Sequence, residues 1–172
     1  MAKALLVIAP SNFRDEELFH TKEELEKAGV STLIASKKKG LIVGMLGGEA
    51  TSEMVLSEVV VDSFDAVVFV GGSGAREYYS DSEALGIARK SFESGKVLAA
   101  ICIAPGILAE AGLLDGKKAT IWNGDGAHSK VLSDGGAEYT GDDLTVDGRI
   151  ITANGPSAAR AFGKRIAEEV ME

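Results

Sequence analysis

Short apolar runs alternate with amphipathic segments along this chain, and this alternation restricts the fold more than any other feature. Each run is long enough for a strand and far too short to span a membrane. In the helical segment Asp15 to Lys27, acids crowd the first turn, Leu18 and Leu25 lie a heptad apart, and Ala28-Gly29 ends the pattern. Such alternation predicts an α/β, doubly wound sandwich with a mostly parallel central sheet and right-handed crossovers. The main strands are predicted at residues 4–9, 30–35, 65–70 and 97–101.

Smaller elements fill the remainder of the chain. Residues 37–61 are interpreted as an excursion that can form a hairpin, since Gly47-Gly48 separates two short β-prone pieces. Asp147-Gly148 predicts a second hairpin within Leu144 to Thr152. Trp122 to Gly136 is predicted to be a loop, because it is rich in Gly, Asn and Asp. Further helices are expected at 81–93, 105–111 and 157–171, with a short strand at 118–121.

Length and composition indicate one globular domain. A chain of 172 residues with 45% hydrophobic and 26% charged residues matches an ordinary folded protein, so residues 1–172 are expected to form a single domain. The formal net charge of -8 disfavours a nucleic-acid partner. The one basic run, Lys37-Lys38-Lys39-Gly40, is interpreted as a turn.

The cysteine and histidine content argues against disulfide-stabilised and metal-binding proteins. The single Cys excludes an intrachain disulfide, and with two distant His residues it gives no familiar metal-ligand spacing, so no metal or cofactor is expected. No apolar run approaches the ~20 residues that a membrane span needs. Met1-Ala2-Lys3 leads into a strand without a signal-peptide cleavage pattern. A cytoplasmic location away from the membrane is therefore the expectation.

Cys102, the only cysteine, lies where an apolar strand gives way to a helix start. Val97 to Ile101 is the strand, and Pro105 suits the first turn of a helix. A tight turn here tolerates only small residues two places to either side. Ala100 and Ala104 meet this requirement, as glycines do in the G-x-S-x-G nucleophile elbow. A helix N-terminus favours a thiolate, whereas an unpaired Cys is also a common inert core residue, so the local sequence leaves both readings open.

Two other loops are expected at the same edge of the sheet. The carboxyl ends of parallel strands meet there, which brings Pro10 to Glu17 and Gly71 to Gly74 beside Cys102 to Gly106. The Gly-rich turn lacks the third Gly of G-x-G-x-x-G and any Walker Lys, which argues against nucleotide phosphates. Its free amides could instead bind a developing oxyanion, or the turn could be purely structural.

An acidic cluster at the first predicted helix supplies a candidate partner for Cys102. Glu17 could touch the thiol and, if buried, stay protonated and donate a hydrogen bond to a thiolate. Asp15 and Glu16 lie beside it, and solvated acids are common at helix starts. These residues alone do not single out one acid.

The histidines and the tryptophan have two readings each. His20 lies one helical turn after Glu17 and could contribute to a pocket or to an interface. His128 falls in the predicted loop and is predicted to be a surface histidine. Trp122 is either a pocket wall or a core filler.

Several of these motifs together resemble the ThiJ/PfpI family, whose members include deglycases and archaeal intracellular proteases. The resemblance covers nearly the whole chain. It implies a flavodoxin-like fold, a homodimer or larger homo-oligomer, and an elbow cysteine with a strained backbone. The matching segments are Glu16-Glu17-Leu18, Lys27-Ala28-Gly29, Val70-Gly71-Gly72, Ala99 to Pro105, Ala111-Gly112-Leu113-Leu114 and Thr152 to Ser157.

Carried over by position, the resemblance assigns roles within the site. Cys102 corresponds to the nucleophile, and Glu17 to the protonated carboxylic acid beside it. Gly72 and Ile103 correspond to the residues whose amides form the oxyanion hole, with Gly71 adjacent. The resemblance thus selects Glu17 among the neighbouring acids.

Two positions depart from the branches of that family. The protease branch has a His directly after the cysteine, where this chain has Ile103, so no base adjoins the thiol and peptidase activity is disfavoured. Trp122 falls where deglycase-like members often carry a pocket histidine, a role that His128 could take over.

The expected function is therefore a cysteine-dependent enzyme of glyoxalase III or deglycase type, with a small reactive carbonyl as its substrate. One alternative is a redox-sensing or chaperone-like stress protein that uses oxidation of Cys102. The other is an intracellular cysteine peptidase.

Overall fold

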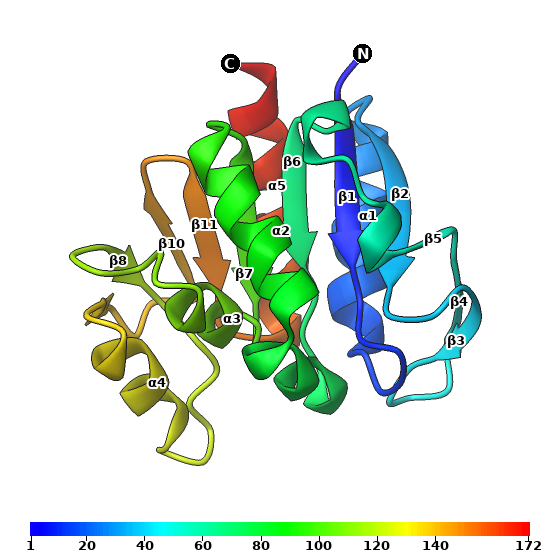
Figure 1. Cartoon of the computed structure of the whole chain (residues 1–172). Coiled ribbons are helices and arrows are strands. Elements are labelled where there is room, and N and C mark those ends of the chain that lie inside the picture. The colour runs from blue at the N-terminus through cyan, green and yellow to red at the C-terminus, as the bar shows by residue number, and fades with distance from the viewer.

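A computed structural model describes all residues, 1–172, and a seven-stranded sheet forms its centre (Figure 1). The strand order is β10-β11-β7-β6-β1-β2-β5. Every neighbouring pair is parallel except β10 and β11, which form the hairpin predicted around Asp147-Gly148. The predicted α/β sandwich with a mostly parallel sheet is confirmed. The strands are β1 Lys3–Val7, β2 Ser31–Ser36, β5 Met54–Val55, β6 Ala66–Phe69, β7 Val97–Ile101, β10 Leu144–Asp147 and β11 Ile150–Ala153.

Helices cover both faces of the sheet and bury two apolar cores. Successive strand residues alternate between these cores: in β1, Leu5 and Val7 pack on the side of α2 and α3, whereas Leu6 packs on the side of α1 and α5. Because both faces are buried, these strands need the continuous apolar runs seen in the sequence. In Figure 1 the helices behind the sheet are α1 (Asp15–Lys27) and α5 (Ala159–Met171), and those in front are α2 (Ser82–Glu93) and α3 (Pro105–Glu110).

Short elements surround this sandwich. The excursion contains the predicted hairpin, in which β3 pairs with β4 in antiparallel register, but its second strand precedes the β-prone piece expected at about residues 54–61. The strand predicted at 118–121 is shorter than expected and pairs with a strand further along the chain. These elements are β3 Gly40–Val43, β4 Glu49–Ser52, β8 Lys118–Ala119 and β9 Glu138–Tyr139, with 3₁₀ helices at Leu56–Glu58, Val61–Ser63, Ser73–Ser80 and Pro156–Ala158.

The prediction of a loop over Trp122 to Gly136 is wrong, because its second half is helix α4 (His128–Asp134). The side chain of Asn123 accepts a hydrogen bond of 2.9 Å from the amide of Ser129 in the first turn. Leu132 is fully buried in the core on the α3 side and anchors the helix there. Asn and Asp are as common at helix starts as in turns, so composition alone does not distinguish the two.

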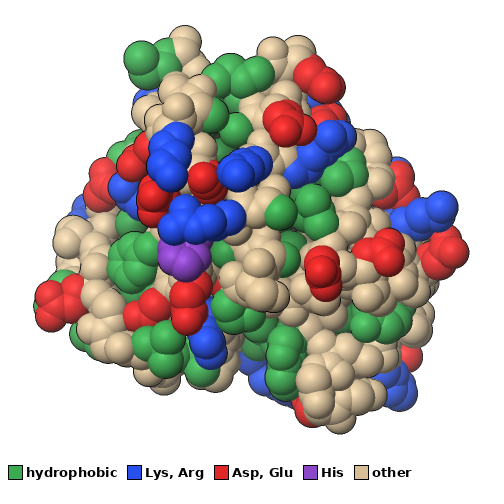
Figure 2. Space-filling model, turned by 180° about the vertical axis from the view of Figure 1, so that it is seen from behind, with side chains coloured by type: hydrophobic (Ala, Val, Ile, Leu, Met, Phe, Trp, Pro, Cys, Tyr) green, Lys and Arg blue, Asp and Glu red, His purple; other side chains and the backbone are tan.

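The face formed by α1 and α5 carries interspersed charges of both signs (Figure 2). Ion pairs join the helices and link successive turns: Arg160 of α5 lies 3.4 Å from Glu23 of α1, and Lys22 lies 2.6 Å from Glu26. Exposed pairs of this kind contribute little to stability. None of the helices combines the length and the apolar character needed to cross a bilayer.

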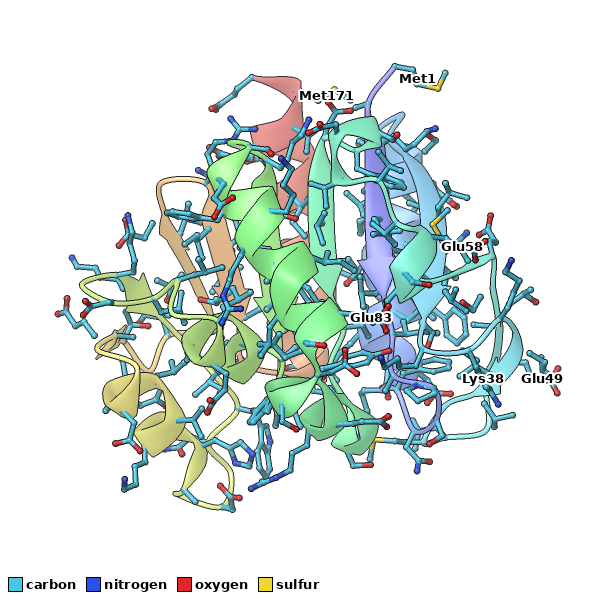
Figure 3. The ribbon with its side chains drawn as sticks, viewed as in Figure 1. Met1, Lys38, Glu49, Glu58, Glu83 and Met171 are labelled. Carbon is cyan, nitrogen blue, oxygen red and sulfur yellow. The ribbon has the colours of Figure 1, made fainter.

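The basic run lies at the rim of the molecule and is partly neutralised by carboxylates. Lys37 forms an ion pair with Glu83, and Lys39 lies 3.1 Å from Glu58. Glu58 and Lys38 are labelled at the outer edge of the molecule in Figure 3, whereas Glu83 lies at the start of α2. Lys37 therefore connects the excursion to α2, whereas the pair of Lys39 and Glu58 lies within the excursion.

Gly163 permits the close approach of α5 to α1. A Cβ added there would lie 2.9 Å from Cβ of Glu24 and 2.9 Å from the carbonyl oxygen of Thr21. We expect Gly163→Ala to lower the free energy of unfolding by about 1–3 kcal/mol, because the helices must separate to admit the methyl group. Chemical denaturation followed by circular dichroism measures this change.

Gly86→Ala is the matched control, because Gly86 lies within α2 with no atom within 4 Å of an added Cβ. There the substitution is expected to raise the free energy of unfolding by about 0.5–1 kcal/mol, through the helix propensity of Ala. Equal stabilisation by both substitutions would contradict the tight packing of α1 on α5.

Candidate active site

Cys102 lies in a sharp turn between β7 and α3. Its φ of 64° puts a non-glycine residue in the left-handed region, at a cost of roughly 1–2 kcal/mol. Two backbone hydrogen bonds hold the turn: the Cys102 amide donates to the carbonyl of Ala153 at 2.9 Å, and the Cys102 carbonyl accepts from the amide of Trp122 at 2.8 Å. The elbow thus has the strained backbone that the resemblance implies.

Close packing beneath the elbow explains its small residues. Ala100 and Ala104 are fully buried. A Cβ on Gly106 would overlap the ring of Tyr79, whose hydroxyl donates a hydrogen bond of 2.6 Å to the carbonyl of Ile103. Tyr79 therefore fixes the backbone of the residue that follows Cys102.

Glu17 projects from the first turn of α1 and is fully buried. A Cβ on Gly71 would overlap both Oε1 of Glu17 and Cβ of Cys102, so these two side chains meet across a glycine. The amide of Arg14 donates to the Gly71 carbonyl at 2.9 Å and draws the start of α1 to this turn. Neither carboxyl oxygen of Glu17 has a regular hydrogen-bond partner, and the groups within reach are the thiol and the Gly71 amide.

Burial controls the ionisation of this pair. It raises the pKa of Glu17 to about 8, so the carboxyl is protonated at neutral pH. Burial also raises the pKa of Cys102, to about 12 when the charge of an ionised Glu17 and its hydrogen bond to the thiol are added, while the amides of Gly72 and Ile103 lower it. With Glu17 protonated that charge is absent, and its O–H can donate to the sulfur. The neutral acid therefore eases the removal of the first proton from the thiol.

A cavity of about 330 Å³ opens above Cys102 and Glu17. Gly72 and Ile103, the predicted sources of oxyanion amides, line it beside the thiol. Trp122 also lines it, so the pocket-wall reading of this residue holds. The cavity is of a size that takes a small organic molecule.

The prediction of His128 as a surface residue is wrong, because it is buried and lines the same cavity. Its ring lies edge-on to Trp122, with centroids 5.3 Å apart. Nδ1 lies 3.0 Å from a carboxylate oxygen of Asp125, and Nε2 has no partner in the protein. The helix α4, which the sequence did not predict, is what turns this histidine inward.

His20 does not line the cavity, although it shares α1 with Glu17. The spacing of two residues on a helix shows that they share a face, but it does not show how deeply each is buried. The position of His20 relative to Glu17 therefore does not indicate whether His20 lines the cavity. Sequence reasoning also missed several contributors. They are Arg14, Met45, Ser73, Arg76 and Pro156 in the cavity wall, Tyr79 under the elbow, and Asp125 beside His128. Arg14 and Arg76 carried a signal, since each is a cation in or next to a loop at the carboxyl edge of the sheet.

The Tyr79 hydroxyl supports the elbow, which makes Tyr79→Phe informative. We expect the free energy of unfolding to fall by about 0.5–1.5 kcal/mol, because the carbonyl of Ile103 loses one of its two donors and keeps only the amide of Gly106. The alkylation rate of Cys102 should change as well, since the turn is free to relax. Tyr139→Phe is the control, because the Tyr139 hydroxyl makes no hydrogen bond, and its effect should stay within about 0.5 kcal/mol. Identical behaviour of the two variants would show that Tyr79 does not brace the elbow.

Comparison with known proteins agrees with this geometry. The model of the DJ-1/PfpI family matches residues 2–169. An uncharacterized protein of Methanocaldococcus jannaschii is 40% identical over 98% of this chain and 82% of its own. The deglycase PfpI of Pyrococcus furiosus is 34% identical over 92% of this chain and 93% of its own. The crystal structure of a ThiJ/PfpI domain protein from Brachyspira murdochii is similar with a TM-score of 0.93 and 33% identity, covering 98% of this chain and 96% of that one. The chain therefore belongs to the DJ-1/PfpI family.

Proposed function

We propose that this protein is a cysteine-dependent enzyme of deglycase or glyoxalase III type that acts on small reactive carbonyls. The observation that carries the proposal is the buried Glu17 carboxyl against Cys102 at the base of the cavity. A nucleophile beside an acid that can release and recover a proton suits addition to a carbonyl group. Relatives named deglycases in Pyrococcus furiosus, at 34% identity, and Escherichia coli, at 29%, support the same class.

The first step begins when the Cys102 thiol loses its proton to solvent beside the protonated Glu17, and the thiolate sulfur then adds to the aldehyde carbon of a 2-oxoaldehyde such as methylglyoxal. The C–S bond forms as the π pair of the carbonyl group moves to oxygen. The amides of Gly72 and Ile103 stabilise the charge developing on that oxygen. Glu17 then gives its proton to the oxygen, which leaves a hemithioacetal and a carboxylate.

The second stage moves one proton between the substrate carbons. The Glu17 carboxylate takes the proton from C1, and the electron pair forms an enediolate with its negative charge on the oxygen of C2. Glu17 returns the proton to C2 while the hydroxyl proton of C1 moves to the oxygen of C2, and the product is a thioester of Cys102. Attack by water then breaks the C–S bond and releases a 2-hydroxy acid and the thiolate, and the proton that the water loses finally restores the neutral Glu17. Substrate and water together account for all atoms of the product, so no oxidant is consumed.

His128 is assigned to the hydrolytic step. Its Nδ1 is held by Asp125, while Nε2 is free to accept a proton from water within the cavity. Asp125 acts as a positioning residue, since it fixes the ring orientation of His128. This pair supplies a base outside the elbow.

The two other functions are less well supported. A peptidase lacks a histidine beside the thiol, because Ile103 occupies that position and is itself buried. Redox sensing would use oxidation of Cys102 to a sulfinate, for which the half-buried thiol is the supporting observation.

Cys102→Ala tests the proposed chemistry directly. We expect the formation of lactate from methylglyoxal to fall by about a thousandfold or more, because no other side chain can form the hemithioacetal. Lactate is measured enzymatically, and thermal melting confirms that the variant is folded. Retention of the wild-type rate would overturn the mechanism. Absence of turnover in the wild type, together with a sulfinate at Cys102 in the mass spectrum after mild peroxide treatment, would favour the redox sensor instead.

A further inference from the structure

The cavity carries positive charge in an acidic protein. Arg14 and Arg76 both line it, whereas the only acid in its wall is Glu17, which is protonated at neutral pH. The whole chain has a net charge of -8, so the charge of the cavity wall is opposite in sign to that of the protein as a whole. Cations gathered in a cleft with apolar walls raise the local concentration of anions.

Arg76 has no partner within the protein. It is exposed, lies in the 3₁₀ helix Ser73–Ser80 that follows the Gly71-Gly72 turn, and forms neither an ion pair nor a hydrogen bond. Of the other arginines, only Arg149 is equally free, and it lies outside this cavity. The remaining ones bind a carboxylate or a carbonyl group: Arg14, Arg89, Arg160 and Arg165.

Arg14 is fixed but keeps one end of its guanidinium free. Its Nε donates to Glu16 at 2.7 Å and its Nη2 at 3.3 Å, which leaves Nη1 without a partner. Its charge acts on both Glu17 and Cys102, so it lies near the reacting atoms. Arg14 therefore holds a fixed guanidinium beside the thiol, partly neutralised by Glu16, and Arg76 supplies an exposed, unpaired one in the wall.

We propose that the cavity selects carbonyl compounds that carry an anionic group, a carboxylate or a phosphate, which Arg76 binds together with Arg14 while the aldehyde lies at Cys102. This inference rests on the proposed function, because it names the substrate class of the same site. A planar guanidinium fork matches the paired oxygens of both anions. The apolar neighbours Trp122, Ile103 and Pro156 reduce water around such a contact and thereby strengthen it.

The test compares matched neutral and anionic aldehydes as protectants of Cys102. Glyoxal and glyoxylate are similar in size and differ in charge, and glyceraldehyde and glyceraldehyde 3-phosphate form the phosphate pair. Each reversibly masks the thiol as a hemithioacetal, and a brief pulse of iodoacetamide reports the unmasked fraction. We expect at least one anion to protect the wild type at about tenfold lower concentration than its neutral partner. The pair in which the neutral and anionic aldehydes differ more in protecting concentration shows whether the site prefers a carboxylate or a phosphate.

Arg76→Gln and Arg149→Gln separate a local contact from net charge, since each removes one positive charge from an unpaired arginine. We expect the anion preference to fall about tenfold in Arg76→Gln and to persist in Arg149→Gln. Equal protection by both members of each pair in the wild type, or equal loss in the two variants, would overturn the inference.

Protection requires binding at Cys102 but not turnover, so the two proposals fail separately. Anion-selective protection without lactate formation from methylglyoxal would contradict the proposed catalysis and support the anion site. Turnover of methylglyoxal without anion-selective protection would support the proposed catalysis and contradict the anion site.

Discussion

The contact between the Glu17 carboxyl and the Cys102 thiol across Gly71 is the interaction on which the site depends. A buried carboxyl without regular hydrogen-bond partners is costly when ionised, so Glu17 stays protonated. That proton is what Glu17 gives to the carbonyl oxygen in the proposed addition step. A side chain at position 71 would push the two groups apart, which explains the glycine there.

The sheet brings these groups together without any direct link between them in sequence. β6 lies between β1 and β7, so the loops after these three strands meet at one edge. The first loop leads to Glu17, the second provides Gly71 and Gly72, and the third contains Cys102. The strained turn is held by the hydrogen bond that the Cys102 amide donates to Ala153 of β11 and by the one that Tyr79 donates to the carbonyl of Ile103, and packing of the surrounding sandwich offsets its cost.

The sequence predicted most of the fold, because buried parallel strands require continuous apolar runs that stand out from helical periodicity. It predicted the position of the elbow from Ala100, Cys102 and Ala104, but it selected Glu17 only through the family resemblance. The inward position of His128 was indicated only by the family resemblance, since it depends on a short helix whose start is bonded to Asn123 and Asp125, residue types that are also typical of turns. No motif indicates Arg76, and its only signal in the sequence is its position just after the Gly71 to Gly74 turn.

The central claim is that Glu17 acts on Cys102 as a neutral hydrogen-bond donor rather than as a charge. The most direct measurement is the pH dependence of Cys102 alkylation by iodoacetamide in the wild type and in Glu17→Leu, which removes the donor and the charge at similar size. The account predicts that alkylation below pH 8, where Glu17 is protonated, is slower in Glu17→Leu than in the wild type, because the thiolate loses a donor. Faster alkylation of Glu17→Leu in that range would contradict it, since that would mean that Glu17 is ionised there and opposes the thiolate.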